Sequence, residues 1–114
     1  MKFYIDQFGS PKIDVSPKDE ALAGFLESDV QASLTSCHEI LSVIKEIQLG
    51  IINSCERTGN SYTADIKHDV VSIVNNFSDS IPVCNITIEE FKSAVQDWLN
   101  IIESLLQFQQ LSDL

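Results

Sequence analysis

The sequence has few basic residues: seven lysines and arginines in 114 residues, none adjacent to another. Proteins that bind nucleic acid directly use clustered Lys and Arg side chains to contact phosphates. The scattered distribution therefore argues against nucleic acid as a direct ligand. The seven are Lys2, Lys12, Lys18, Lys45, Arg57, Lys67 and Lys92.

Glycine is also scarce, and the four glycines stand apart from one another. A glycine-rich loop that could cradle a phosphate group is therefore missing. No apolar run approaches the roughly 18 residues that a membrane-spanning helix needs. The first residues also lack the apolar segment and cleavage site of a secretory signal. We expect a cytoplasmic protein that does not bind membranes.

The three cysteines, Cys37, Cys55 and Cys84, are odd in number and far apart. This usage fits reduced thiols better than a disulfide framework. Cys37 falls on the apolar stripe of a predicted helix, and Cys84 falls in a short apolar strand. Because free cysteine is among the most often buried residue types, both are expected in the core rather than as nucleophiles. Cys55 is left open.

Residue patterns typical of catalysis or metal binding are missing. His38 follows Cys37, and adjacent residues of a helix point in different directions. His68 lies beside Asp69 in a predicted turn, where a solvated histidine is expected. No zinc-ligand spacing or calcium-binding loop occurs. We expect no metal, no cofactor and no enzymatic activity, with a small enzyme as the third alternative.

Acidic residues are plentiful by contrast: 17 Asp and Glu give a formal net charge of −10. They are spread along the chain rather than gathered in a tail. One explanation is solubility alone. The other is electrostatic attraction of a basic protein, which can raise association rates by about 10–1000-fold at low salt.

The N-terminal part of the chain predicts a hairpin followed by a short helix. Residues 2–8 alternate as a strand, residues 9–11 form a turn, and residues 13–15 form a return strand. Ser16 and Pro17 are typical of a helix start, with the serine as the cap. A short helix through residues 21–26 follows.

Ser28 and Asp29 are predicted to begin a second, longer helix that ends at Gly50 in a left-handed conformation. Its apolar positions recur at steps of three and four, which predicts one buried face. These positions are Val30, Leu34, Cys37, Ile40, Leu41, Ile44 and Ile47.

The middle of the chain changes to a period of two. Strands are predicted over residues 51–57, 62–67, 70–77 and 83–86, joined by turns at 58–60 and 68–69 and a loop at 78–82. Together they form an antiparallel meander.

The last helix is predicted to run from Ile88 to about Gln109. It begins with a capping box of Thr87 and Glu90, and Trp98 lies on its apolar stripe as an expected core residue. The tail that contains Leu106, Phe108, Leu111 and Leu114 either docks or forms an exposed apolar patch for homo-oligomerisation. The whole chain, residues 1–114, is expected to fold as a single α+β domain: the meander and the short N-terminal hairpin pack on two long helices and one short helix.

Two stretches resemble small immunity proteins of contact-dependent growth inhibition systems. They are residues 1–6 with 13–17 (MKFYID and IDVSP), and residues 57–63 (RTGNSYT). The stretch 27–63, with its long helix, the Leu49–Gly50 helix end and the following GNSYT, also resembles a YacL-like family of uncharacterised small proteins.

The first resemblance implies a partner and a role. Such immunity proteins bind the C-terminal toxin domain delivered by a neighbouring cell, often a nuclease that cuts transfer RNA, and block its active site. We expect a 1:1 complex with the toxin. The alternative, implied by the second resemblance, is a cytosolic adaptor without enzymatic activity.

Candidate toxin-binding residues follow from the predicted meander rather than from the family. Asp65 lies on the wet face of its strand, and Asp69 and Asp79 lie in loops of the meander. Glu56 is expected to join these three residues across the hairpin. Carboxylates in this region would occupy a basic nuclease surface in place of phosphates.

Overall fold

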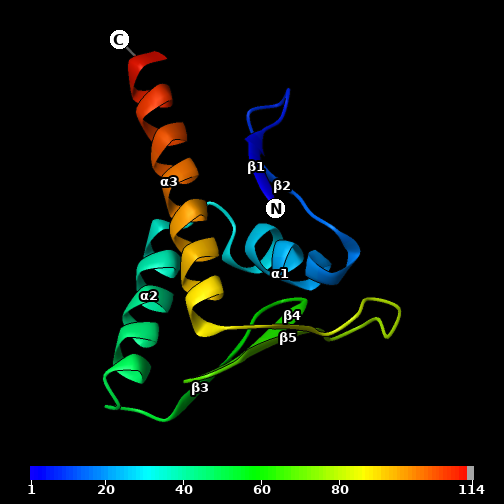
Figure 1. Cartoon of the computed structure of the whole chain (residues 1–114). Helices are drawn as coiled ribbons and strands as arrows, with labels where there is room; N and C mark the ends of the chain where they lie inside the picture. Colours follow the sequence, from blue (N-terminus) through cyan, green and yellow to red (C-terminus); the bar gives the residue numbers. More distant parts are fainter. Residues whose placement is uncertain (113–114) are drawn as a thin grey trace.

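Figure 1 shows helices over one face of an antiparallel sheet, with a small hairpin packed beside them. In this computed structural model the chain is described from residue 1 to residue 112, with side chains described to residue 108. The strands are β1 (Lys2–Ile5), β2 (Pro11–Asp14), β3 (Ser54–Thr58), β4 (Tyr62–Lys67), β5 (Val71–Asn75) and β6 (Cys84–Ile86). The helices are α1 (Glu20–Gly24), α2 (Leu34–Gln48) and α3 (Ile88–Ser112), with a 3-10 turn η1 (Pro17–Asp19) and a π-helix η2 (Phe25–Val30). The predicted α+β class is confirmed.

The hairpin of β1 and β2 is shorter at its tip than predicted. The Asp6 carboxylate accepts hydrogen bonds from the N–H groups of Phe8 and Ser10, each at 2.9 Å. Gly9 adopts a φ of 78°, which glycine tolerates without cost. Because this turn begins at Asp6, β1 ends at Ile5 rather than at residue 8.

The predicted helix start at Ser28–Asp29 is wrong. Residues 25–30 form the π-helix η2, which ends at Gln31 with a φ of 56°. The second long helix begins three residues later, where the Ser33 side chain accepts a hydrogen bond from Ser36 N–H at 3.1 Å. Asp29 cannot act as a cap because its carboxylate binds another segment of the chain.

Gly50, two residues after the end of α2, adopts the predicted left-handed conformation, with a φ of 76°. The N–H groups of Ile51 and Ile52 both turn back to the carbonyl oxygen of Glu46. This turn delays the start of β3 to Ser54, three residues later than predicted.

The meander has the strand order β3-β4-β5-β6, and every pair is antiparallel. In β4, Tyr62, Ala64 and Ile66 are buried and the residues between them are not, so the predicted alternation is confirmed. The buried side of the sheet packs against α1 and η2. α2 and α3 run in opposite directions side by side (Figure 1).

α3 carries the largest core side chains. Trp98 is 1% exposed, and its indole lies 6.4 Å from the ring of Phe3. The predicted capping box is confirmed, because Glu90 N–H donates to the Thr87 hydroxyl and Thr87 N–H donates to the Glu90 carboxylate. The core position predicted for Trp98 is confirmed as well.

Three residues in and just after η2 hold three different parts of the molecule. Glu27 accepts a hydrogen bond from Ile13 N–H of the hairpin at 2.7 Å. Asp29 accepts bonds from the N–H groups of Ser61 and Tyr62 at 3.0 and 2.7 Å, at the start of β4. The carbonyl oxygen of Gln31 accepts a bond from the Trp98 indole N–H at 2.8 Å. Hairpin, sheet and α3 are therefore all tied to one short segment.

The end of α3 presents apolar side chains to solvent. Leu106 is 38% exposed and Phe108 is 69% exposed. The side chains of Leu111 and Leu114, which belong to the predicted oligomerisation tail, lie outside the described residues. Association of two copies through this tail stays a prediction. Within residues 1–112, no helix has both the length and the apolar character needed to cross a bilayer.

We predict that Asp29→Ala lowers the free energy of unfolding by about 3 kcal/mol, since two backbone N–H groups lose a charged acceptor. Urea denaturation measures the change. The exposed Asp79, for which no hydrogen bond occurs among the described side chains, supplies the control: Asp79→Ala should change stability by less than about 0.5 kcal/mol. Equal effects of the two substitutions would contradict the role assigned to Asp29.

Candidate protein-binding site

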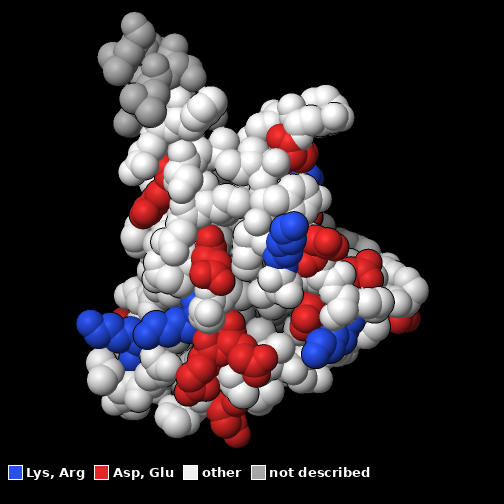
Figure 2. All heavy atoms as spheres, turned by 45° about the horizontal axis from the view of Figure 1, so that its top comes forward, with Lys and Arg blue, Asp and Glu red and all other residues white. Residues whose placement is uncertain are grey.

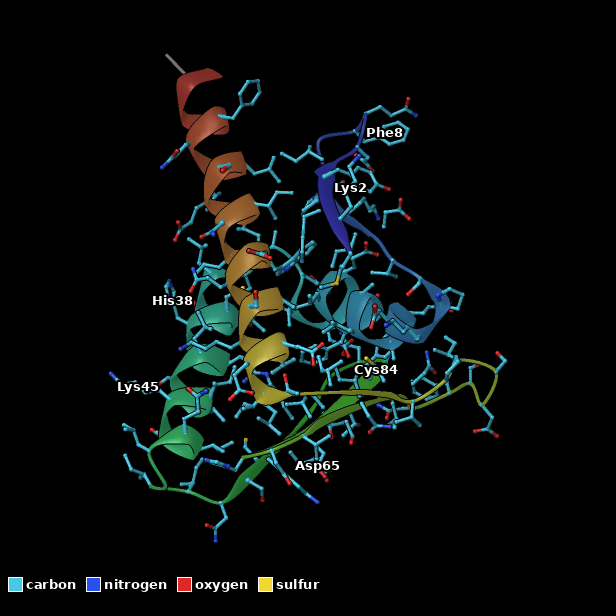
Figure 3. All side chains as sticks on the ribbon, in the orientation of Figure 1. Lys2, Phe8, His38, Lys45, Asp65 and Cys84 are labelled. Carbon is cyan, nitrogen blue, oxygen red and sulfur yellow. The ribbon has the colours of Figure 1, made fainter. Side chains whose placement is uncertain are left out.

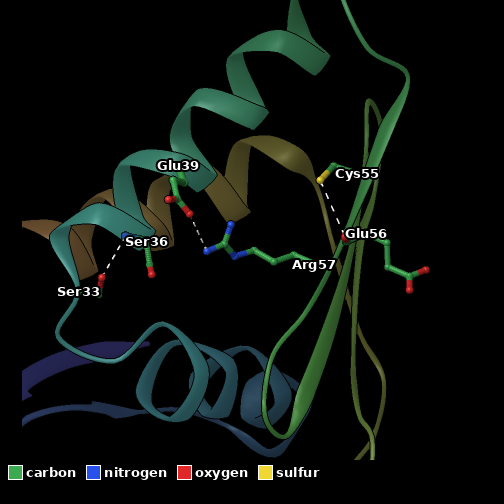
Figure 4. Close-up of polar contacts among 6 residues, drawn as sticks. All are labelled: Ser33, Ser36, Glu39, Cys55, Glu56 and Arg57. Atoms are coloured by element: carbon green, nitrogen blue, oxygen red, sulfur yellow. Dashed lines mark hydrogen bonds and ion pairs between the residues drawn. The ribbon is translucent and has the colours of Figure 1, made fainter.

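A polar row crosses the outer face of the four-stranded sheet. The register aligns Glu56 with Asp65, Asp65 with Ser72, and Ser72 with Asn85. In Figure 3, Asp65 points to the side of the sheet away from the helices, and in Figure 4 Glu56 points away from α2. The row is therefore open to a partner.

Glu56 and Asp65 are close neighbours within this row. Gly59 N–H donates to the Tyr62 carbonyl, so these two residues form a hydrogen-bonded pair at the turn. Hydrogen-bonded and non-hydrogen-bonded pairs alternate along antiparallel strands, which makes the Glu56–Asp65 pair non-hydrogen-bonded. Side chains are closest in such pairs, and like charges directly opposite are destabilising. Lys67 offsets part of this repulsion, with its Nζ 3.6 Å from an Asp65 oxygen.

The two remaining candidate residues lie at opposite ends of the sheet. Asp69 is exposed in the turn after β4, beyond Lys67. Asp79 is exposed in the loop after β5, at the end where Asn75 pairs with Tyr62. The structure thus brings Glu56 and Asp65 together and places Asp79 away from them. The binding role of all four residues stays a prediction.

Sequence reasoning missed a further acidic residue at this edge of the molecule. Glu39 of α2 forms an ion pair with Arg57 of β3, with 3.1 Å between the Arg57 Nη2 and a Glu39 oxygen. The guanidinium spans the space between helix and strand in Figure 4. No local pattern could reveal the pair, because the partners are 18 positions apart.

A hollow of about 480 Å³ lies beside β3. Phe25, Asp29 and Val30 of η2 line one side, and residues 56–60 line the other. The Asp29 carboxylate is engaged by backbone N–H groups, and the Arg57 guanidinium is engaged by Glu39. The charges of Asp29 and Arg57 are thus already paired, whereas Glu56, the third charged residue of the lining, forms no ion pair with any described side chain.

Many carboxylates serve the fold rather than a partner. Asp6, Glu27, Asp29 and Glu90 each accept at least one hydrogen bond from a backbone N–H. Acidic side chains nevertheless cover more of the face drawn in Figure 2 than basic ones do, with a broad acidic area near its lower centre. When the four structural carboxylates are subtracted from the 17 acidic residues, 13 remain against seven basic ones, so the acidic surplus persists.

Comparison with known proteins identifies a family. A family model described as "Uncharacterised protein family (UPF0231)" matches residues 1–103. The chain belongs to this family. No curated protein and no solved structure matches it. The match offers no support for the resemblance to growth-inhibition immunity proteins, whereas it is compatible with the likeness to a small uncharacterised family.

The buried cysteines are poor nucleophiles. Burial, reinforced by the charge of Glu103, raises the pKa of Cys37 to about 11. Burial, with the charge of Asp19 next in size, raises the pKa of Cys84 to about 11. The core positions predicted for both are confirmed, and Cys55 is partly exposed on β3. Among the described residues, no three His, Cys, Asp or Glu side chains are placed to hold a metal ion.

We predict that one thiol, that of Cys55, reacts rapidly with a disulfide reagent at pH 8 in the folded protein. Cys37 and Cys84 should react only after unfolding, since both are buried and both stay protonated well above pH 8. Absorbance of the released thiolate measures the count, and a Cys55→Ser variant should lose the fast phase. Rapid reaction of all three thiols would contradict the burial.

The raised pKa values also fix an alkaline limit to stability. The unfolded thiols ionise near 9.0 and the folded ones near 11. The folded state therefore binds more protons between these values, and its stability falls as the pH rises from about 9 to 11.

Proposed function

We propose that this protein is a non-catalytic binding module that uses the outer face of its four-stranded sheet to hold a basic protein. The observation that supports this most is the close pairing of Glu56 with Asp65 on an open sheet face. The net charge of −10 adds long-range attraction to the same class of partner.

The Glu56–Asp65 pair favours binding over a purely structural role. Two like charges in a non-hydrogen-bonded pair cost stability in the free protein. A lysine or arginine of a partner placed between them would turn this repulsion into two attractions. Lys67 neutralises only one of the two acids, and Glu56 has no ion pair among the described side chains.

In its specific form, the proposal makes the partner a nuclease toxin domain and this chain its cytoplasmic immunity protein. A nuclease presents basic groups to phosphates, and a carboxylate row could occupy that surface in a 1:1 complex. Inhibition would then result from occlusion, without any reaction on this chain.

The second candidate is a housekeeping adaptor that binds a basic protein without inhibiting it. The family match over residues 1–103 is compatible with the YacL-like resemblance from which this candidate comes, and it assigns no role to the family. Gene order separates the two, since an immunity gene should directly follow a large toxin gene.

We predict that the protein forms a 1:1 complex with the product of the gene immediately upstream and suppresses its nuclease activity. The association rate should fall about tenfold or more from low to physiological salt. Failure to bind would contradict the immunity form, and a complex with undiminished nuclease activity would favour the adaptor.

Charge-reversal variants locate the surface in the same assay. Glu56→Lys combined with Asp65→Lys should abolish inhibition. Glu89→Lys combined with Glu103→Lys changes the net charge equally, on exposed positions of α3, and should retain it. Equal losses from both pairs would show that total charge, rather than the sheet face, determines binding.

We further predict that Glu56→Gln raises the free energy of unfolding by about 0.2–1 kcal/mol, because it removes the repulsion from Asp65. The gain should shrink as salt is added. Urea denaturation at two salt concentrations measures it, with Asp79→Asn as the control for the loss of one charge. A destabilised Glu56→Gln variant would show that the pair is not repulsive.

A further inference from the structure

We propose that the free edge of β3 accepts an extended, lysine-bearing segment of a protein partner as a fifth antiparallel strand. This inference rests on the proposed function and names the segment through which the basic partner is held. Three observations support the inference: the backbone pattern of β3, the open space beside β3 and the charge of Glu56.

Alternate residues of β3 present their backbone groups to solvent. The hydrogen bond from Gly59 N–H to the Tyr62 carbonyl fixes the phase of the β3–β4 ladder. Cys55 and Arg57 therefore turn their N–H and C=O groups toward β4, and the residues between them turn theirs outward. The outward-facing residues are Ser54, Glu56 and Thr58.

These outward groups have no strong partner among the described residues. The one hydrogen bond to them is a weak contact from the Cys55 Sγ to the Glu56 carbonyl at 4.0 Å. β3 is the edge strand of the sheet, and it packs closely only against β4. Such an unpaired row of donors and acceptors is a template for pairing with another strand.

Space beside β3 accommodates the side chains of an added strand. The hollow of about 480 Å³ opens along residues 56–60 and has Phe25 and Val30 of η2 in its wall. The ion pair of Arg57 with Glu39 bridges α2 and the strand (Figure 4). Side chains on this inner side of an added strand would meet a guanidinium, so neutral residues fit there and basic ones do not.

The outer side of the added strand requires the opposite charge. The residue directly opposite Glu56 would exchange two backbone hydrogen bonds with it and lie on the same face. A lysine at that place gains the favourable cross-strand pairing of opposite charges. Asp65 lies in the next strand of the same row and adds to the attraction. The matching segment therefore alternates basic and neutral residues.

The same charge disfavours a second copy of this chain on the edge. Full antiparallel overlap of two β3 strands sets Glu56 against Glu56, and like charges directly opposite are destabilising. Charged residues on edge strands commonly prevent self-association in this way. Glu56 thus rejects a copy of the chain and selects a basic strand.

Two N-methylated peptides test the proposal on the full-length protein. The probe is a short peptide of alternating lysine and threonine, titrated into the protein labelled with ¹⁵N. Its lysines lie opposite Glu56, so N-methylation of the lysines should weaken binding about tenfold or more by removing donors to β3. N-methylation of the threonines, whose N–H groups point away, should change affinity less than about twofold. Hydrogen exchange should slow at the amides of Ser54, Glu56 and Thr58 alone.

Charge variants complete the test. Glu56→Lys should weaken binding of the lysine peptide about tenfold and allow a glutamate–threonine peptide to bind. The matched Glu103→Lys, on an exposed position of α3, should leave both affinities within about twofold. If the lysine peptide binds but both methylated forms bind equally well, the acidic binding function stands and the edge site is wrong. If no lysine peptide binds, the edge site is wrong, and the complex with the upstream gene product decides the proposed function separately. Protection of the edge amides together with a doubled mass in the protein alone would show a second copy there instead.

Discussion

The fold depends on one short segment, the π-helix η2 and the residue after it, whose polar groups bind the hairpin, the start of β4 and α3. Within η2, Glu27 binds the hairpin and Asp29 binds the start of β4, and the Gln31 carbonyl oxygen just after it accepts a hydrogen bond from the Trp98 indole. A π-helix is rare because its wider turn is less favourable than an α-turn. Here the π-helix is stabilised by hydrogen bonds from Ile13 and Tyr62 to its acidic side chains. An α-helix over the same residues would direct those side chains differently.

The candidate site follows from this constraint. Asp29 fixes the β3–β4 turn, and a side chain at Gly59 would overlap its carboxylate. Since η2 and α1 cover the inner face of the sheet, the outer face and the edge of β3 are left open. The position of the acidic row is therefore determined by a segment that contributes none of its residues.

Sequence periodicity sufficed to predict most elements and to place Glu56 and Asp65 on the two strands of one hairpin, because alternation and turn residues are local signals. The direct pairing of the two residues comes from the structure. It failed at Asp29, where a residue type typical of helix caps binds a strand 32 positions away instead. It also failed to separate Asp79 from the other acids, since loop direction depends on strand order. The Arg57–Glu39 pair and the phase of the β3 edge arise only from tertiary contacts.

The acidic surplus therefore has two physical components. Carboxylates such as Asp6 and Glu27 are satisfied by backbone N–H groups, so their charge stabilises turns and joins segments. No backbone N–H among the described residues donates to the Glu56 carboxylate, which faces Asp65 across the ladder. The repulsion between Glu56 on the edge strand and Asp65 on β4 lowers the stability of the free protein, and the charge of Glu56 opposes pairing of two β3 edges. A positive charge bound beside Glu56 and Asp65 would remove this loss of stability. A second copy of the chain would still meet the charge of Glu56, so the proposed edge site favours a basic partner over another copy.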